Sequence, residues 1–285
     1  MITILGTGLL GSGFARALKR QGHDVRAWNR THAKAQALAA DGVTVVADPA
    51  EAVRGAERIH IVVSDDAAVD SVLAAAAPGF SRNALVFDHS TTSPAGALAR
   101  TNSWRERGIT YVHAPVFMGP QNAVESTGLM LISGDRELVA RVSPLLAPMT
   151  GKLVDLGPRV DKAAAFKLLG NLILMAFTAG FTDFLALAKA LDVSSTEAGT
   201  LFEHFNPGNS LVSRYKRISA ADYDPPSWEL AMARKDARLM QEEATRAGLP
   251  LIMVPALAQL MDTKIAEGHG HADWTVVANE LLKGR

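Results

Sequence analysis

The feature that most constrains the fold of this chain is the stretch from Asp161 to Leu191. It contains no proline and consists largely of strong helix formers, so it predicts one long helix. Between Leu168 and Phe181 the stretch is apolar on nearly every face, which indicates a helix that is buried on most of its surface. It is also long enough to span a bilayer, but polar residues such as Asn171 and Asp183 interrupt it. We therefore expect a core helix that joins two domains.

Lys167 and Asn171 are set into this apolar surface. Residues four apart lie on one helix face about one turn apart, so the ammonium and the amide point into the same space. A lone lysine at the edge of a core usually extends its charged head group into water instead. The motifs described below favour the other interpretation, in which this pair carries the chemistry.

The composition is that of an ordinary soluble protein, with 48% hydrophobic and 20% charged residues. The length of 285 residues exceeds what one core usually holds, so we expect two domains, residues 1–160 and 161–285. The formal net charge of +0 argues against a general affinity for nucleic acid or for an anionic membrane surface. The absence of cysteine excludes disulfides, thiolate nucleophiles and cysteine-ligated metals. The chain opens with a strand rather than a signal segment, so we expect a cytoplasmic protein.

Apolar runs of strand length alternate with amphipathic stretches of helix length from Met1 to Leu156. The expected strands are Ile2–Leu5, Val25–Trp28, Val43–Val46, Ile59–Val63, Ala84–Phe87, Ile109–His113, Leu129–Ser133 and Leu153–Leu156. Such alternation requires crossover connections, so it predicts a Rossmann-like, doubly wound and mainly parallel sheet. Less helix joins the last strands, and we expect that part of the sheet to include antiparallel pairing.

Beyond Leu156 the strand pattern stops and only helical patterns follow. They lie at Ser195–Phe205, Pro226–Ala247, Met253–Glu267 and Trp274–Leu282, with a polar loop and a short helix between Asn206 and Asp224. The sequence therefore predicts an all-helical C-terminal domain that follows the long interdomain helix. Apolar residues from Leu251 to Leu260 are consistent with a dimer interface built from this domain.

The first strand is followed by Gly6-Thr7-Gly8-Leu9-Leu10-Gly11, which matches the G-x-G-x-x-G pattern of dinucleotide-binding turns. The pattern is weak alone, but here it follows a strand and opens a helix, as the motif requires. Gly6 permits a tight turn, Gly8 lets the backbone approach a pyrophosphate, and Gly11 lets helix and strand pack closely. We expect the turn formed by Gly6, Gly8, Leu9, Leu10 and Gly11 to bind a dinucleotide.

The second strand ends at Trp28 and is followed by Asn29-Arg30-Thr31. NAD sites usually carry an acidic residue here for the ribose hydroxyls, whereas NADP sites need a cation for the 2′-phosphate. No carboxylate is present, and Arg30 can offer a phosphate a planar fork of donors, with Asn29 and Thr31 adding neutral hydrogen bonds. A solvated arginine beside a Thr31 helix cap does not explain the missing acid. We expect NADP as the cofactor.

Further strand ends carry polar or turn-forming residues, and ligands of such sheets lie at the carboxyl ends of the strands. Ser64 follows the fourth strand, where its backbone can contact the cofactor. Ser90 and Thr91 follow the fifth strand, where their hydroxyls and amides can hold a nicotinamide ribose or a substrate carboxylate. His89 lies beside them, and His113 to Pro120 forms a turn-rich loop at the same edge.

Together these motifs resemble the β-hydroxyacid dehydrogenases, which include 3-hydroxyisobutyrate dehydrogenase, tartronate semialdehyde reductase and the glyoxylate and succinic semialdehyde reductases. The resemblance covers the whole length of the chain. Its motifs fall in order along the sequence: the glycine turn, Asn29-Arg30-Thr31, Asp88 to Pro94, Ala114-Pro115-Val116, Lys167 with Asn171, and Lys235-Asp236.

The resemblance implies that Lys167 is the catalytic residue and that Asn171 orients the reacting oxygen of the substrate. It also implies that Thr91 and Lys235 lie against the cofactor. Dimers and tetramers are common in such families, so we expect a homodimer or homotetramer formed through the helical domain. The partner of the site is a small-molecule substrate.

The chain departs from the family pattern near the expected substrate. The family commonly has Ser-Gly-Gly after Ala-Pro-Val, where this chain has Phe117-Met118-Gly119. His113 stands in place of an aspartate, and Gly170 stands where asparagine is frequent. A serine donor is lost and two bulky apolar groups are gained, so we expect a substrate pocket that favours a more apolar carbonyl or imine.

The function that follows is hydride transfer between NADPH and the carbonyl carbon of a small β-hydroxyacid or semialdehyde, with Lys167 donating or accepting the proton. Burial beside an apolar helix face lowers a lysine pKa from about 10.4 toward the working pH. Two alternatives stay open: an imine reductase-like enzyme, whose relatives commonly carry aspartate or tyrosine at this position, and a non-catalytic NADP-binding module. No metal is needed, and His269 and His271 are expected on an exposed loop.

Overall fold

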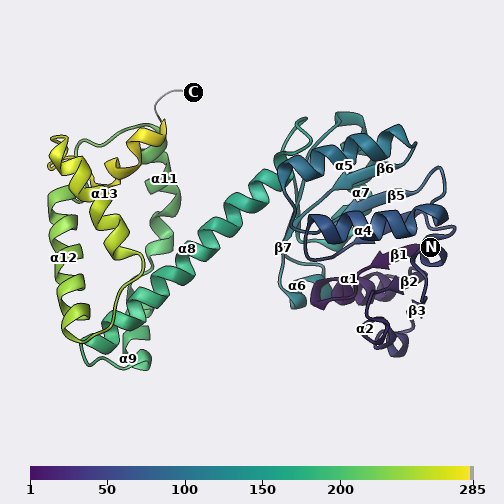
Figure 1. Cartoon of the computed structure of the whole chain (residues 1–285), viewed down its shortest axis with the longest axis horizontal. Helices are drawn as coiled ribbons and strands as arrows, with labels where there is room; N and C mark the ends of the chain where they lie inside the picture. Colours follow the sequence, from purple (N-terminus) through teal and green to yellow (C-terminus); the bar gives the residue numbers. More distant parts are fainter. Residues whose placement is uncertain (283–285) are drawn as a thin grey trace. The chain divides into compact units, whose positions relative to one another are not determined.

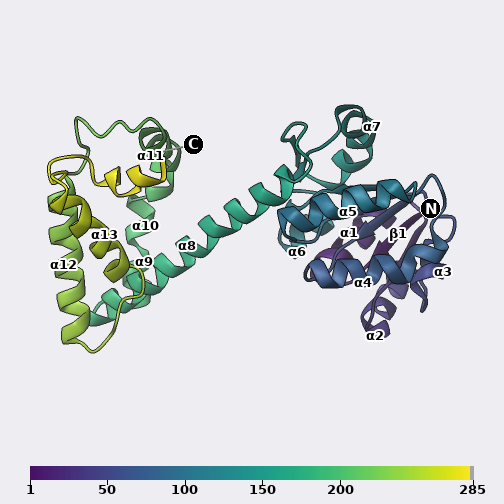
Figure 2. The same ribbon diagram turned by 45° about the horizontal axis from the view of Figure 1, so that its top comes forward.

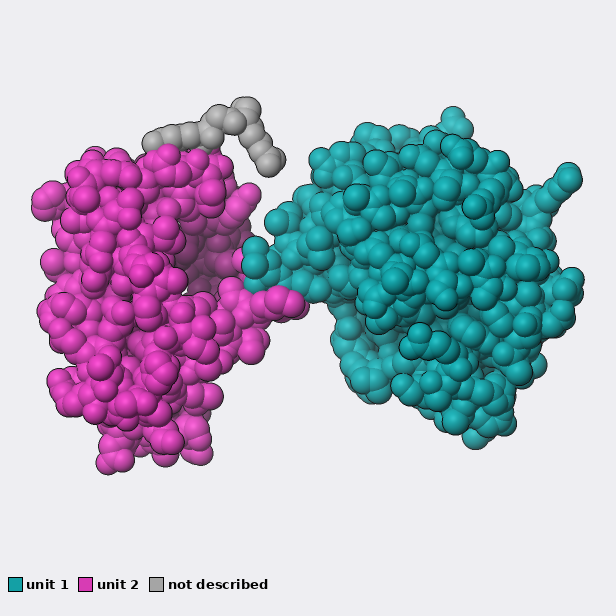
Figure 3. Space-filling view, viewed as in Figure 1, with its two compact units in different colours: residues 1–172 teal, residues 173–285 magenta. Residues whose placement is uncertain are grey.

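The computed structural model describes residues 1–282 of the chain. Figure 3 distinguishes its two compact units, residues 1–172 and the part of the chain that begins at residue 173. The boundary lies inside helix α8 (Lys162–Ala190), so the first residues of this helix belong to one unit and the remainder to the other. The domain boundary expected from the sequence, between residues 160 and 161, lies just before the start of α8.

The first unit is built on a six-stranded sheet with the strand order β3-β2-β1-β4-β5-β6, and all its strands are parallel. The strands are β1 (Ile2–Leu5), β2 (Val25–Trp28), β3 (Thr44–Val45), β4 (Arg58–Ile61), β5 (Leu85–Asp88) and β6 (Thr110–His113). Leu5 pairs with Trp28 on one side and with Ile61 on the other, so the three central strands end at one level. The strand order reverses direction at β1, which is the position where such sheets bind ligands.

Helices cover both faces of this sheet. They are α1 (Leu9–Arg20), α2 (His32–Gln36), α3 (Pro49–Val53), α4 (Asp66–Ala76), α5 (Pro94–Glu106), α6 (Pro120–Glu125) and α7 (Arg136–Leu146). Ile4 packs in one core cluster with Phe14 of α1, whereas its neighbour Leu5 packs in the opposite cluster with Leu73 of α4 and Trp104 of α5. Side chains alternate along a strand, so one strand feeds both layers. Figures 1 and 2 show α4 and α5 in front of the strands, and the predicted Rossmann-like architecture is confirmed.

A second, smaller sheet completes the first unit. It contains β7 (Val116–Phe117), β8 (Leu129–Ile132) and β9 (Lys152–Asp155), with β7 antiparallel to β8 and β8 parallel to β9. The sequence predicted a loop throughout His113 to Pro120, and this is wrong at its centre. A strand of two residues is too short to produce a periodic pattern, and Pro115 separates it from β6.

The second unit contains helices and no strand among its residues up to 282, as predicted. Its elements after α8 are α9 (Ser195–Gly199), α10 (Leu201–His204), the 3-10 helix η4 (Pro207–Ser210), α11 (Leu211–Ser219), α12 (Leu230–Arg246), α13 (Val254–Ala266) and the 3-10 helix η5 (Trp274–Leu282). Its core cluster joins Leu230 and Ala237 of α12 to Met261 of α13 and Val276 of η5. The polar stretch from 206 to 224 holds a short helix, α11, as expected.

Asp183 of α8 fixes the start of α13. Its buried carboxylate accepts hydrogen bonds from the backbone N–H groups of Ile252, Met253 and Val254, at 2.6, 2.8 and 3.1 Å. The first N–H groups of a helix have no partner inside the helix, and they form the positive end of its dipole. A carboxylate supplied by another helix satisfies both requirements, which explains an acidic residue inside an apolar stretch.

The middle of α8 exposes its apolar side chains in the single chain. Leu172 is 61% exposed, Met175 68% and Phe177 45%. By length and composition α8 could cross a membrane, and only 11% of its most apolar window is buried. The expectation of a helix buried on most of its surface is therefore wrong for one chain alone. An apolar pattern indicates that a surface avoids water, but it does not identify what covers that surface.

Candidate active site

A cavity of about 700 Å³ lies at the carboxyl ends of β1, β2, β4 and β5 in the first unit. Most of the residues that the sequence singled out line it. They are Gly6, Gly8, Leu9, Leu10, Asn29, Arg30, Thr31, Ser64, Ser90, Thr91, Met118 and Lys167. The lysine therefore shares a cavity with the glycine turn, although the two are far apart in the sequence.

The glycine turn has the backbone geometry that a nucleotide phosphate requires. Gly6 adopts φ +99, and a Cβ there would lie 2.2 Å from the carbonyl oxygen of Val62. A Cβ on Gly11 would lie 2.0 Å from the carbonyl oxygen of Gly6, so helix and strand can approach only without a side chain. Gly8 faces open space at the first turn of α1, where no side chain caps the helix. The uncapped N–H groups and the open position fit a pyrophosphate.

Asn29 holds two of the cavity's loops together. Its Oδ1 accepts a hydrogen bond from the N–H of Thr7 at 2.9 Å, and its Nδ2 donates to the carbonyl oxygen of Thr31 at 3.0 Å. Both halves of the amide are thus engaged within the chain. Arg30 and Thr31 are exposed at the cavity edge, as is Lys34 of α2, which sequence reasoning missed. The available signal was the position of Lys34 one turn beyond Thr31 on the following helix.

Lys167 and Asn171 meet on one face of α8. The Lys167 Nζ donates a hydrogen bond to Asn171 Oδ1 at 3.0 Å. The same nitrogen lies 4.2 Å from the centre of the Phe117 ring. The lysine side chain is half-buried, and this burial lowers its pKa. The Asn171 oxygen accepts the hydrogen bond from the lysine, so the amide nitrogen Nδ2 is left to donate a hydrogen bond to a ligand.

The three residues Phe117, Met118 and Gly119 serve different purposes. Met118 lines the cavity, as does Val116 two positions earlier. Side chains alternate along a strand, so Phe117 points the other way, toward Gly170 and Lys167 on α8. The Gly119 N–H donates to Asn122 Oδ1 at 2.8 Å at the start of α6. Of the predicted substrate contacts in this loop, Met118 lines the cavity. Phe117 instead packs against Gly170 and Lys167 of α8.

The serines at the other strand ends make local hydrogen bonds. Ser64 Oγ donates to Asp65, whose carboxylate caps α4. Ser90 is buried, and its Oγ accepts a hydrogen bond from the N–H of Val63 at 3.0 Å. Thr91 is half-buried at the cavity wall. Ser90 therefore links the loops after β4 and β5, which sets the shape of the wall between them.

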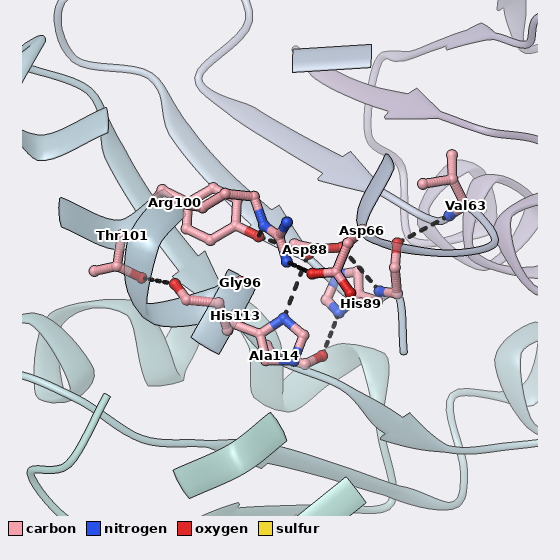
Figure 4. Close-up of polar contacts among 12 residues, drawn as sticks. Val63, Asp66, Asp88, His89, Gly96, Arg100, Thr101, His113 and Ala114 are labelled. Atoms are coloured by element: carbon pink, nitrogen blue, oxygen red, sulfur yellow. Dashed lines mark hydrogen bonds and ion pairs between the residues drawn. The ribbon is translucent and has the colours of Figure 1, made fainter. Parts of the chain in front are cut away.

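A buried polar network supports the ends of β5 and β6, and Figure 4 shows its members around Asp88. Tyr111 Oη donates to Asp88 Oδ2 at 2.6 Å, and His113 Nδ1 lies 3.4 Å from the same oxygen. Arg100 donates to Tyr111 Oη at 3.1 Å and to Asp66 at 2.7 Å. Burial opposes ionisation of Asp88, but the hydrogen bonds to this carboxylate outweigh it and lower its pKa.

The tautomers of His60 and His89 follow from their partners. His89 Nδ1 lies 2.7 Å from the carbonyl oxygen of Ala114, which can only accept, so this nitrogen carries the proton. His89 Nε2 is then an acceptor for the N–H at Nδ1 of His60, at 2.9 Å. Burial lowers the pKa of His89 to about 4 and that of His60 well below its ordinary value. Both rings are neutral at physiological pH, and His89 lines the cavity as an uncharged group.

Lys235, which the family resemblance places against the cofactor, lies on α12 in the second unit. Its Nζ pairs with the carboxylate of Asp236 at 2.8 Å. Its contact with the cofactor stays a prediction.

The chain matches two family models. Residues 1–157 match the NAD binding domain of 6-phosphogluconate dehydrogenase. Residues 162–281 match the model described as NAD-binding of NADP-dependent 3-hydroxyisobutyrate dehydrogenase. The two models together cover nearly the whole chain, and their division lies close to the start of α8.

Relatives are similar over nearly the full length. The 3-sulfolactaldehyde reductase of Escherichia coli (strain K12) is 26% identical over 292 residues, which cover 98% of this chain and 95% of the relative. The probable 3-hydroxyisobutyrate dehydrogenase of Mycobacterium tuberculosis (strain ATCC 25618 / H37Rv) is 27% identical over 294 residues, which cover 98% and 97%. The solved imine reductase from Myxococcus stipitatus in complex with NADP+ has a TM-score of 0.92 at 20% identity and covers 99% of both chains. At that identity the likeness shows the fold alone.

Burial of His60 and His89 makes the stability of the first unit depend on pH. In the unfolded chain an imidazole takes up a proton below about pH 6.5, whereas native His89 stays neutral down to about pH 4. The unfolded state binds more protons between these values, so we expect the free energy of unfolding to fall as the pH falls from about 6.5 to 4. At about 1.4 kcal/mol per pKa unit, His89 alone contributes a loss on the order of 3 kcal/mol.

Urea unfolding at pH 7 and at pH 4.5 measures this loss. The His89→Gln variant should be less stable at pH 7 but should lose less stability on acidification, because its side chain does not titrate. His32→Gln, at an exposed position, is the control and should retain the wild-type pH dependence. If wild type and His89→Gln lost the same free energy of unfolding on acidification, His89 would not be a cause of the pH dependence.

Proposed function

The chain belongs to the β-hydroxyacid dehydrogenase family and is an NAD(P)-dependent oxidoreductase of a small-molecule substrate, and we propose that it uses NADP(H) with Lys167 as the proton donor and acceptor. The reaction interconverts a carbonyl and a hydroxyl group on a substrate of the β-hydroxyacid or semialdehyde type. The observation that carries the proposal is the half-buried lysine in the same cavity as the glycine turn.

When bound, NADPH supplies the hydride that reduces the carbonyl carbon. Lys167 donates a proton from Nζ to the carbonyl oxygen, which becomes the hydroxyl group, and the neutral amine regains its proton from water. In the oxidative direction the neutral amine accepts the hydroxyl proton. Asn171 keeps the lysine in place through Oδ1 and can donate from Nδ2 to the same substrate oxygen. The lowered pKa of Lys167 supports both roles, because it brings the two protonation states closer to the working pH.

The preference for NADP rests on the charges at the end of β2. Arg30 and Lys34 line the edge of the cavity, and the Asn29-Arg30-Thr31 segment contains no carboxylate to bind ribose hydroxyls. A guanidinium and an ammonium suit a 2′-phosphate, to which arginine can donate two parallel hydrogen bonds. We assign Arg30 as the main phosphate contact and Lys34 as a second positive charge beside it.

A second candidate is reduction of an apolar C=N bond. It is favoured by the side chains of Met118 and Val116, which give the cavity wall near Lys167 an apolar character. A protonated lysine that meets a neutral carbonyl oxygen still suits carbonyl reduction better, because a protonated imine carries its own positive charge and would repel the ammonium.

We also propose that a second copy of the chain covers the exposed face of α8. The side chains of Leu172, Met175 and Phe177 point to different sides of α8, and together they form part of an exposed apolar surface too extensive for a helix that remains in water. A bilayer is a poor occupant, because Asp183 holds the start of α13 against the same helix. A homodimer or homotetramer through this helix would bury this apolar surface, and closed symmetry makes each chain cover the other.

Replacing Lys167 with methionine tests the chemistry. The variant keeps the length of the side chain but removes the amine, so we expect kcat to fall by about 10²- to 10⁴-fold while NADPH still binds. The measurement is NADPH absorbance with a panel of semialdehydes, ketoacids and cyclic imines, together with NADPH binding. Lys162→Met, on the same helix, is the control and should keep its turnover. Full turnover in Lys167→Met would rule out the proposed role, and turnover of cyclic imines alone would select the second candidate.

Replacing Arg30 with alanine tests the cofactor preference. Loss of a charge-assisted contact should raise the Kd for NADPH by about 10- to 100-fold and leave the Kd for NADH nearly unchanged. Lys34→Ala should have a smaller effect of the same kind. Arg82→Ala, at an exposed position outside the cavity lining, is the control. Equal weakening of both cofactors would show that Arg30 does not recognise the 2′-phosphate.

Replacing Met175 with lysine tests the assembly. A charge at the most exposed of these apolar positions would be buried against the second copy, so the variant should shift toward monomer in light scattering coupled to gel filtration. Leu98→Lys changes an exposed leucine on α5 and should leave the assembly unchanged. A wild-type protein that is monomeric at micromolar concentration would refute the proposal.

A further inference from the structure

The geometry points to Phe117 as a positioning residue for Lys167, held in place because position 170 is glycine. The inference rests on the proposed function only in calling Lys167 catalytic; the contact between the ring and the ammonium stands without it. Three observations carry it: the 4.2 Å between Lys167 Nζ and the centre of the ring, the space that Gly170 leaves, and the lack of a carboxylate beside the amine among residues 1–282.

The ring occupies the place that a side chain at position 170 would need. A Cβ built on Gly170 would lie 2.2 Å from Phe117 Cζ and 2.6 Å from Cε1. Two carbon atoms that are not bonded to each other cannot lie this close, so any residue other than glycine at position 170 would displace the ring. Phe117 lies on β7 and Gly170 lies one turn from Lys167 on α8, so the pair joins the small sheet to the catalytic helix.

The ring stabilises the charged form of the lysine. One N–H of the ammonium is directed to Asn171 Oδ1, and the ring presents its negative face to the cation. In the part of the chain that the structure describes, Arg30, Lys34 and His89 are the other titratable groups that line the cavity. The lowered pKa of Lys167 is caused by burial rather than by any of these groups. The aromatic face therefore opposes the effect of burial and keeps a larger share of the lysine protonated.

The inference gives a pH dependence with a defined sign. Removing the aromatic face destabilises the ammonium, so the pKa of Lys167 should fall by about half a unit to one and a half units. In carbonyl reduction the protonated lysine is the active form, so the alkaline limb of the kcat profile should move to lower pH. In alcohol oxidation the neutral amine is active, so the rising limb should move in the same direction. A change in packing alone would lower kcat in both directions, but it would not move the alkaline limb of reduction and the rising limb of oxidation to lower pH together.

The experiment compares Phe117→Leu, Gly170→Ala and the double variant. Phe117→Leu keeps an apolar side chain without an aromatic face, and Gly170→Ala displaces the ring. Both should shift the two limbs to lower pH. In the double variant the smaller leucine leaves room for the alanine Cβ, so the stability lost in Gly170→Ala should be partly recovered while the pH shift remains. Phe166→Leu is the matched control, because its ring lies 5.6 Å from Lys162 Nζ on the same helix and its removal should not alter the profile.

A direct titration separates this inference from the proposed function. NMR of the protein labelled with 13C at lysine Cε gives the pKa of Lys167 without turnover, with Lys167→Met identifying its signal. A lower pKa in Phe117→Leu and Gly170→Ala supports the inference even if Lys167→Met retains turnover, in which case the proposed function alone fails. An unchanged pKa in both variants, with turnover lost in Lys167→Met, would overturn the inference and leave the proposed function intact.

Discussion

The proposed chemistry depends on one amine, that of Lys167, being held partly out of water beside the cavity at the edge of a parallel sheet. Withdrawing an ammonium from water is costly unless the protein supplies substitutes for the lost hydration. Here the substitutes are the Asn171 Oδ1 and the face of the Phe117 ring. The helix that carries the amine is also anchored: Ala163 and Ala164 are fully buried, and the Ala163 N–H donates to Ser133 Oγ at 2.9 Å. The amine is thereby fixed in relation to the cavity rather than free to follow solvent.

The part of the cavity wall formed by the loop after β5 is held by a buried polar network. At the end of β5, Asp88 receives hydrogen bonds from the backbone N–H of Ser90 and from the side chain of Tyr111, both inside the first unit. A buried network of this kind is stabilising only when its members are satisfied, because each unpaired polar group loses its hydration without return. Among the described residues His60 Nε2 and His113 Nε2 are buried and have no hydrogen-bond partner, so these two atoms lose their hydration without replacement. Such a network favours one arrangement of the strand ends and disfavours small shifts among them.

Much of the fold was predictable because its signals are local. The strands from β1 to β6 and the long helix α8 follow from apolar runs, and the glycine turn follows from spacing alone. The site was predictable as far as residues at strand ends were concerned, since parallel topology brings those ends together. The features that the sequence did not predict depend on the direction of a side chain or on a contact with a residue that is distant in the sequence. The use of both halves of the Asn29 amide, the position of Phe117 behind the lysine, and the His60–His89 pair each require a contact with a residue far away in the sequence. The exposure of the middle of α8 in the single chain also escaped prediction, because an apolar pattern does not identify what covers a surface.

Phe117 and Gly170 show why departures from a family pattern should be considered in space rather than one at a time. In the sequence they are two separate departures from the pattern that the family resemblance implies, a serine at one position and an asparagine at the other. In the structure the ring of the first fills the space left by the second. A glycine inside a helix is less favourable than alanine by about 1 kcal/mol, and a close contact that only glycine permits can offset this cost at position 170. The packed ring fills the space beside Gly170 and leaves no cavity there, and filling such a space stabilises a core. Phe117 and Gly170 are therefore one packing unit, and this unit places an aromatic face beside the amine of Lys167.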